Sequence, residues 1–184
     1  EISYGVGLIV TNATPLGGYV EQYTNVSNGK FLGINYLIWI AIIVAAITWF
    51  IFNMTRHGKY MYAIGGNPQA AEVAGVPVKA TLILIYMKAA AMYGLAGFML
   101  GAKAGGASVQ TGYGYEMEAI AACTIGGVSV TGGRGKVSSA IIGVAVFELL
   151  KVALQYLGMN ANAQYIAIGV VIFIAISLDI RKYI

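Results

Sequence analysis

The chain has 184 residues, with 11 Lys and Arg, 7 Asp and Glu, and a formal net charge of +4. Hydrophobic residues make up 59% of it and charged residues 10%, and the mean hydropathy is +0.76. A soluble domain carries about 25% charged residues, so this composition excludes a water-soluble globule and predicts a membrane protein. The single Cys and single His, without CxxC or HExxH motifs, also exclude an intrachain disulfide and a zinc ligand set.

Apolar segments follow one another along the chain and predict membrane spans. Residues 1–10 resemble the end of an earlier span, and residues 11–34, rich in turn-forming residues, predict an external loop. Residues 35–53 carry no charge, match the roughly 20 residues that cross a bilayer, and have Trp39 and Trp49 near their two ends. The other predicted spans are residues 81–102, the short glycine-rich 117–131, 137–157 and 164–180.

The predicted fold class is therefore all-α, a polytopic transmembrane helical bundle with about five spans in a single domain. Its orientation follows from Lys and Arg, which accumulate in cytoplasmic connections. Two of them, Lys30 and Lys103, lie on one predicted side. Seven lie on the other: Arg56, Lys59, Lys79, Arg134, Lys136, Arg181 and Lys182. We therefore expect the loop 54–80 and the C-terminus to be cytoplasmic, which requires residues 117–131 to cross the membrane.

The stretch AIGGNPQAAEVAGVPV, residues 63–78, predicts a short helix inside the loop 54–80. Asn67 is suited to the N-cap and Pro68 to the first helical position. Gly75 can adopt the left-handed conformation after the helix, and Pro77 prevents its continuation. A helix of two turns is marginal alone, so packing must hold it. The pattern alone fits either a capped turn between two spans or an element whose small residues let another surface approach closely.

Two strings resemble one family. TRHGKYMYAIGGNPQAAEVAGV, residues 55–76, resembles the cytoplasmic coupling segment of the permease subunits of bacterial ATP-binding cassette sugar importers of the ribose/galactose/xylose type. GYEMEAIAACTIGGVSVTGGRG, residues 114–135, has that family's two acidic residues, Ile-Ala-Ala, Gly-Gly and Gly-Gly-x-Gly in the same order. The resemblance covers nearly the whole chain, is strongest to the galactose/methyl-galactoside branch, and corresponds to the C-terminal half or slightly more of such a subunit.

The resemblance implies that the short helix docks in a groove of a cytoplasmic ATPase. The residues it assigns to this coupling are Gly65, Gly66, Asn67, Pro68, Gln69, Ala70, Ala71, Glu72 and Gly75. It implies three further partners, namely an extracytoplasmic sugar-binding protein, a second permease copy and membrane lipid, in the bacterial cytoplasmic (inner) membrane, and no nucleic acid. Arg56, Lys59 and Arg134 form a cytoplasmic flank that can contact acidic groups of the ATPase or lipid phosphates.

No cofactor is expected in this chain. GGRGKV has Val137 where a phosphate-binding loop needs Ser or Thr, and it lacks the upstream glycine. ATP and Mg would therefore be bound by the partner ATPase, and no catalytic residue is expected here. The predicted function is the permease subunit of an ATP-driven monosaccharide importer, and the chain itself is no enzyme. The alternative is an ion-coupled secondary transporter acting without an ATPase, with Glu148 as its only clear ion site.

Charged residues within the predicted spans are functional candidates because they are costly in a bilayer. Lys88 departs from the usual family pattern, and it faces the central cavity, pairs with Glu148 or marks a different span boundary. Glu148 and Lys151 are three residues apart and can pair on one helix face. Glu118 and its neighbour Glu116 either favour a helix N-terminus or form a polar mouth for sugar hydroxyls. The predicted translocation-pathway residues are Glu118, Lys88 and Glu148.

Overall fold

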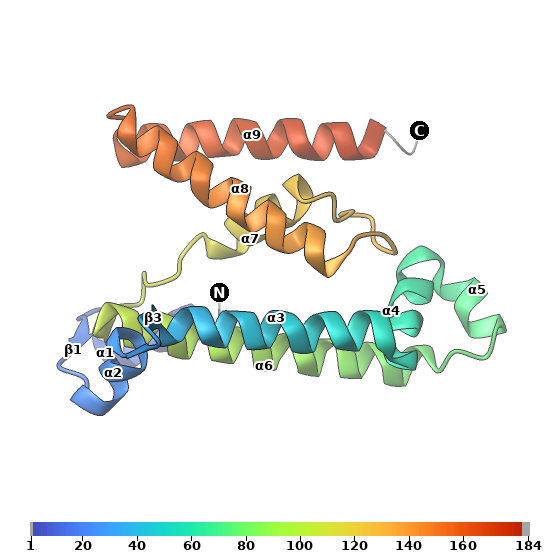
Figure 1. Ribbon diagram of the computed structural model, residues 1–184, viewed down its shortest axis with the longest axis horizontal. Coiled ribbons are helices and arrows are strands. Elements are labelled where there is room, and N and C mark those ends of the chain that lie inside the picture. Colours follow the sequence, from blue (N-terminus) through green and yellow to red (C-terminus); the bar gives the residue numbers. More distant parts are fainter. Residues whose placement is uncertain (1, 182–184) are drawn as a thin grey trace. The chain divides into compact units, whose positions relative to one another are not determined.

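The computed structural model describes residues 2–181, in which helices predominate and strands are short (Figure 1). The helices are α1 Ile2–Thr11, α2 Glu21–Asn28, α3 Tyr36–Met54, α4 Arg56–Gly66, α5 Pro68–Val73, α6 Val78–Ala104, α7 Tyr115–Ile125, α8 Val137–Tyr156 and α9 Ala161–Arg181. The strands are β1 Leu16–Gly17, β2 Lys30–Phe31, β3 Ile34–Asn35 and β4 Gly106–Ala107. Lys182, counted above as cytoplasmic, lies outside the described residues, and so does the side chain of Arg181.

Three of the described helices, α3, α6 and α8, are long and apolar enough to cross a membrane. None of the α3 or α6 side chains in the most apolar stretch is buried within the chain. A helix that is hydrophobic all round and uncovered suits lipid as its surroundings. The 27 residues of α6 extend for about 40 Å at 1.5 Å per residue, which exceeds the hydrocarbon core. The predicted all-helical, polytopic transmembrane fold class is confirmed.

Helix α7 is shorter than the span predicted around it. It has 11 residues and is about 16 Å long, because Gly127 takes a positive φ of 82° just after Gly126. The amides of Gly127 and Val128 then bond back to Thr124 and Cys123, at 2.9 and 3.0 Å, which ends the helix in a Schellman motif. Residues 126–136 continue to α8 without regular structure. The crossing of the membrane by residues 117–131, and with it the number of five spans, stays a prediction.

The chain divides into two compact units. The first comprises Glu1–Val44 and Leu84–Tyr113, and the second Ala45–Ile83 and Gly114–Ile184. In the first unit, β1 pairs antiparallel with β4, and the Tyr23 hydroxyl donates to the Phe98 carbonyl at 2.6 Å. These contacts attach the predicted external segment 11–34 to α6, within the same unit, and to the strand β4 that follows it.

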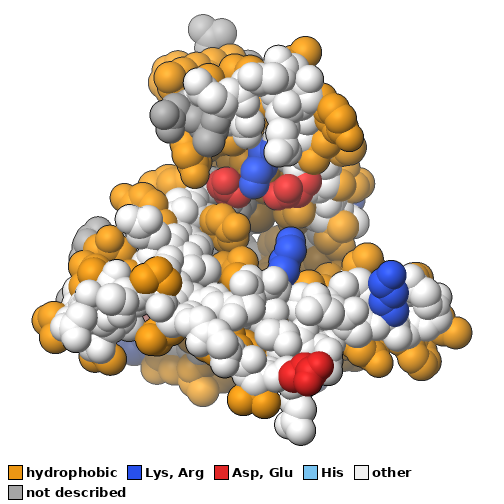
Figure 2. Space-filling model, turned by 90° about the vertical axis from the view of Figure 1, so that its left-hand side faces the viewer, with side chains coloured by type: hydrophobic (Ala, Val, Ile, Leu, Met, Phe, Trp, Pro, Cys, Tyr) orange, Lys and Arg blue, Asp and Glu red, His pale blue; other side chains and the backbone are white. Residues whose placement is uncertain are grey.

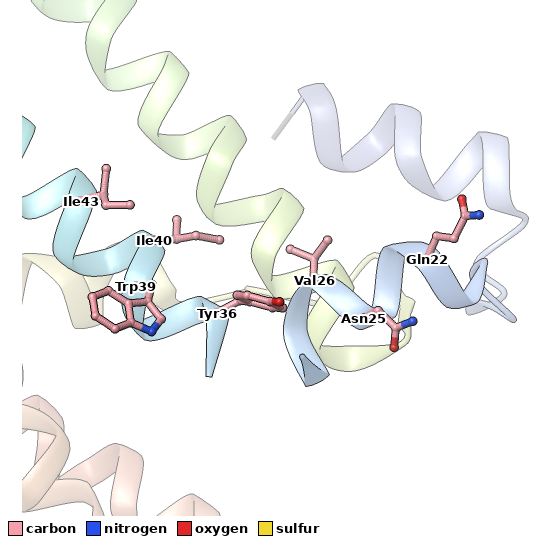
Figure 3. A pocket seen from close by; sticks show the side chains of 7 residues that line it. All are labelled: Gln22, Asn25, Val26, Tyr36, Trp39, Ile40 and Ile43. Atoms are coloured by element: carbon pink, nitrogen blue, oxygen red, sulfur yellow. The ribbon is translucent and has the colours of Figure 1, made fainter. Parts of the chain in front are cut away.

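The first unit also holds an apolar pocket of about 470 Å³ between α2 and the start of α3 (Figure 3). It is lined by Gln22, Asn25, Val26, Tyr36, Trp39, Ile40 and Ile43. The amide groups of Gln22 and Asn25 turn away from the aliphatic side chains in Figure 3. The Trp39 indole N–H is engaged by the Phe31 carbonyl at 3.2 Å. The pocket therefore offers mainly hydrophobic surface and is poorly suited to hold a polyhydroxylated ligand.

The core of the second unit joins α7, α8 and α9. It consists of Ala121 and Ala122 from α7, Phe147 from α8 and Ile168 from α9, all buried. Small residues bring α7 and α8 into backbone contact: a Cβ on Gly143 would lie 2.6 Å from the Gly126 nitrogen and would also meet the Ala122 carbonyl. Because no side chain separates the two backbones at this point, α7 and α8 behave as one packed pair.

Candidate functional site

The loop between α3 and α6 forms two helices, and one residue separates them. The Thr55 hydroxyl caps the start of α4 by accepting from the Gly58 amide at 3.1 Å. Asn67 ends α4 in an extended conformation, with φ −157° and ψ 105°. The same residue begins α5, because its Oδ1 accepts from the Ala70 amide at 3.0 Å, and Pro68 follows at the first helical position.

The end of α5 is fixed as firmly as its start. Gly75 has φ +82°, and its amide bonds to the Glu72 carbonyl at 3.0 Å. The Val76 amide bonds to the Ala71 carbonyl at 3.0 Å, which completes a Schellman motif. The short helix predicted from Asn67, Pro68 and Gly75 is confirmed. Its capping at both ends holds a helix of six residues that could not persist by propensity alone.

The residues of α5 divide by exposure. Ala71 is only 4% exposed and packs inward, whereas Val73 is 91% exposed. We name the exposed face the coupling surface; it comprises Pro68, Gln69, Ala70, Glu72 and Val73. Of the remaining predicted coupling residues, Gly66, Asn67 and Gly75 are exposed and Gly65 is half-buried. Sequence reasoning missed Val73, although a valine beside charged and small residues in a capped loop helix was a signal for it.

The C-terminal end of α4 contacts the turn that precedes α8. A Cβ on Gly65 would lie 2.5 Å from the Gly133 nitrogen, and one on Gly133 would lie 2.6 Å from the Gly66 nitrogen. The Tyr62 hydroxyl, one helical turn before Gly65, donates to the Gly135 carbonyl at 2.8 Å. These contacts bring the two strings that were singled out in the sequence, residues 55–76 and 114–135, into direct contact.

The predicted cytoplasmic flank is exposed. Arg56 and Lys59 lie three residues apart on one face of α4, and both are exposed. Arg134 is also exposed and lies in the turn that contacts the end of α4. Arg134 therefore lies in the chain near the C-terminal end of α4, and Arg56 and Lys59 lie near its N-terminal end.

A cluster of one cation and two carboxylates connects α7 with α8. The predicted pair of Glu148 and Lys151 is confirmed, with 3.5 Å between Nζ and Oε1. The shorter contact was not predicted: Lys151 Nζ donates to Glu118 Oε2 at 2.8 Å. Figure 2 shows acidic and basic side chains side by side with hydrophobic ones around them. The Lys151–Glu118 pair joins two helices. Because both groups are charged, their hydrogen bond is stronger than one between neutral groups.

The surroundings of the cluster distinguish its two carboxylates. The side chains of Lys151 and Glu118 are 28% and 22% exposed, and that of Glu148 is 58% exposed. The ammonium also lies 5.7 Å from the centre of the buried Phe147 ring. Glu118 is therefore held by Lys151, and Glu148 keeps more of its surface open.

Of the predicted pathway residues, only Lys88 lies outside the second unit. It is half-buried within α6, in the part of that helix assigned to the first unit. Its pairing with Glu148 and its position toward a cavity stay predictions. Among residues 2–181 no group of three or more His, Cys, Asp or Glu is arranged to hold a metal ion.

Comparison with known families decides the class of the chain. Residues 3–176 match the family described as the permease component of the branched-chain amino acid transport system. The chain belongs to this permease family. This membership agrees with the length and apolar character of α3, α6 and α8.

The similar proteins include sugar permeases. The chain is 39% identical to the galactose/methyl galactoside import permease protein MglC of Haemophilus influenzae and 38% identical to that of Escherichia coli K12, each over 99% of this chain and 56% of the relative. It is 34% identical to the ribose import permease protein RbsC of Escherichia coli K12, over 97% of this chain and 57% of the relative. The chain thus spans about half the length of these curated relatives. No solved structure matches it.

Proposed function

We propose that the chain is part of the permease subunit of an ATP-driven importer for a galactose- or ribose-like monosaccharide. The observation that carries this proposal is the 37–39% identity, over 99% of the chain, to permeases named for galactose and methyl galactoside import. The family description refers to branched-chain amino acids, but the relatives compared above are named for sugars. A sugar is therefore the favoured class of substrate.

The coupling surface is the proposed contact with a cytoplasmic ATPase. It is small, capped at both ends and exposed, and its largest open apolar side chain is that of Val73. A groove of complementary shape on the ATPase could bind this short helix without changing its conformation. ATP and Mg would bind the ATPase subunits, and their closure would press on α5. No bond of the sugar is made or broken by this chain, whose task is to open the pathway alternately to the two sides.

The remaining partners follow from the same proposal. A soluble sugar-binding protein would deliver the monosaccharide from outside, and a second permease copy would complete the pathway in the bacterial inner membrane. Arg56, Lys59 and Arg134 would lie at the cytoplasmic surface, where basic residues contact anionic lipid headgroups or an acidic partner. Glu118 and Glu148 would contribute acceptor oxygens for sugar hydroxyls near the pathway.

Reconstitution of the full-length permease tests this function. In proteoliposomes with its ATPase subunits and binding protein, we expect uptake of labelled galactose or ribose that requires ATP hydrolysis. An ATPase variant that binds but does not hydrolyse ATP is the control and should give no uptake. Uptake driven by a proton or sodium gradient, without ATPase subunits, would instead establish the secondary-transporter alternative, with Glu148 as its ion site.

Cysteine labelling tests the proposed orientation. Gln69 and Val20 are both exposed, one on the coupling surface and one in the segment 11–34. In a full-length permease in which Cys123 has been replaced, we expect Gln69→Cys to react with a membrane-impermeant maleimide in inverted vesicles only. Val20→Cys is expected to react in intact spheroplasts only. Labelling of Gln69→Cys from outside would place the coupling surface on the wrong side for an ATPase.

A further inference from the structure

The end of α4 and the turn 132–135 meet backbone against backbone. A Cβ on Gly65 would lie 2.5 Å from the nitrogen and 2.9 Å from the Cα of Gly133. From the other side, a Cβ on Gly133 would lie 2.6 Å from the nitrogen and 2.7 Å from the Cα of Gly66. Neither partner leaves space for a methyl group. The contact therefore has no flexible side chain that could absorb a displacement of α4.

The turn is held in place by its own bonds. The Ser129 amide bonds to the Arg134 carbonyl at 3.1 Å, and the buried Ser129 hydroxyl lies 2.8 Å from that of Thr131. Gly135 has φ +138°, and a Cβ there would lie 3.0 Å from a methyl group of Val128. Since Tyr62 also bonds to the Gly135 carbonyl at 2.8 Å, α4 holds the turn at two separate points.

The turn belongs to the connection between α7 and α8, which form one packed pair. These helices touch at Gly126 and Gly143 and share the bond between Glu118 and Lys151. Packed interiors have few voids and transmit a displacement rather than absorbing it. A push on α5 is expected to reach α4 through Asn67 and through the packing of the two helices, and then the turn, α7 and α8.

We infer that Gly65, Gly133 and Tyr62 form the contact that passes movement of the coupling surface to α7 and α8. Gly65 is thus a positioning residue that faces the permease itself, in contrast to the ATPase-facing role that the resemblance implies for it. The inference rests on the proposed function, because a coupling contact has meaning only in an ATP-driven permease. It assigns the transmission of force to α7 and α8 in addition to the covalently attached α3 and α6.

The test compares two Gly→Ala changes in the full-length permease, assembled with its ATPase subunits and binding protein. Gly65→Ala inserts a methyl group into the contact. Gly169→Ala, inside α9, makes the same change at a helical position where nothing lies within 4 Å of the new Cβ. We expect the complex with Gly65→Ala to hydrolyse ATP but to import about tenfold less sugar per ATP. This decrease lies within the roughly 5–150-fold effects that are typical of coupling between two sites. Gly169→Ala should keep the wild-type ratio.

A second variant keeps the test decisive if Gly65→Ala fails to assemble. Tyr62→Phe adds no volume and removes only the hydrogen bond to Gly135, so it should also lower the sugar imported per ATP. Its control, Tyr60→Phe on the same helix, removes a hydroxyl for which the described structure shows no hydrogen bond. A wild-type amount of sugar imported per ATP in Tyr62→Phe, or in an assembled Gly65→Ala, would overturn the inference. ATP-driven uptake by the wild type would still support the proposed function. Absence of that uptake would refute the proposed function itself.

Discussion

Replacing Val73 by arginine is expected to abolish ATP-driven uptake while the full-length permease remains folded in the membrane. Val73 is 91% exposed at the end of α5, so the substitution has little to disturb within the chain. Docking in a groove would bury the valine, which contributes about 1.5–3 kcal/mol. An unpaired guanidinium in the same place would have to lose its water, which costs several kcal/mol more. Both effects oppose docking.

The lost burial of the valine alone lowers the docking affinity by about tenfold or more, since each 1.4 kcal/mol is a factor of ten, and desolvation of the guanidinium lowers it further, so that uptake is lost. It should be measured together with co-purification of the ATPase subunit, which should fall in parallel. Val20→Arg makes the same change at a 70% exposed valine in the segment 11–34 and should leave both quantities unchanged. Normal uptake by Val73→Arg would mean that the coupling surface does not dock.

Ala71 gives an informative contrast on the same helix. It is 4% exposed, so an arginine there would clash with the permease rather than with a partner. Loss of uptake after Ala71→Arg would therefore report damage to the fold, and membrane insertion alone would not distinguish the two causes. The docking hypothesis is tested by the exposed residues of α5 and not by its buried alanine.

Replacing Lys151 by methionine is expected to destabilise the full-length permease. The change keeps an unbranched, flexible side chain in place of the aliphatic part of lysine. It leaves Glu118 and Glu148 without their shared cation. Breaking a fully buried pair costs roughly 3–5 kcal/mol. Because these side chains are partly exposed, we expect about 2 kcal/mol, which lowers the Tm by about 5 °C. Thermal unfolding of the detergent-solubilised protein measures the effect.

The matched control removes the carboxylate together with its partner. Lys151→Met combined with Glu118→Gln leaves only Glu148 without its cation, and because that side chain is 58% exposed to solvent, most of the lost stability should return. Lys151→Arg keeps the charge and should stay within about 1 kcal/mol of the wild type. A Lys151→Met single variant with the wild-type Tm would show that the cluster does not hold α7 to α8.

Local sequence signals were enough to predict α5. The features that were not predicted depend on contacts between residues far apart in the sequence. The caps of α5 depend on Asn67, Pro68 and Gly75, whose conformational preferences act within a few residues, and the structure has them as predicted. The pairing of Glu148 with Lys151 is likewise a property of one helix face. The bond between Lys151 and Glu118 joins residues 33 positions apart, and helical periodicity carries no information about such a partner.

The glycines and Ala71 show the same limit. The small residues of the stretch 63–78 indicated that another surface can approach closely, but only the structure shows that Gly65 and Gly66 pack on Gly132 and Gly133. The small side chain of Ala71 suggested a docking residue, whereas its actual neighbours belong to the permease. A small residue is compatible with an approaching surface on either side, so sequence reasoning could not assign the direction.

Asn67 has a mechanical consequence because it is the one residue between α4 and α5, ending the first helix and beginning the second. The tilt of α5 against α4 depends on one pair of backbone torsions, φ and ψ of this asparagine. Its Oδ1 bond to the Ala70 amide opposes rotation about ψ. Because this bond acts together with the packing of α5 against α4, a torque applied to α5 is passed to α4.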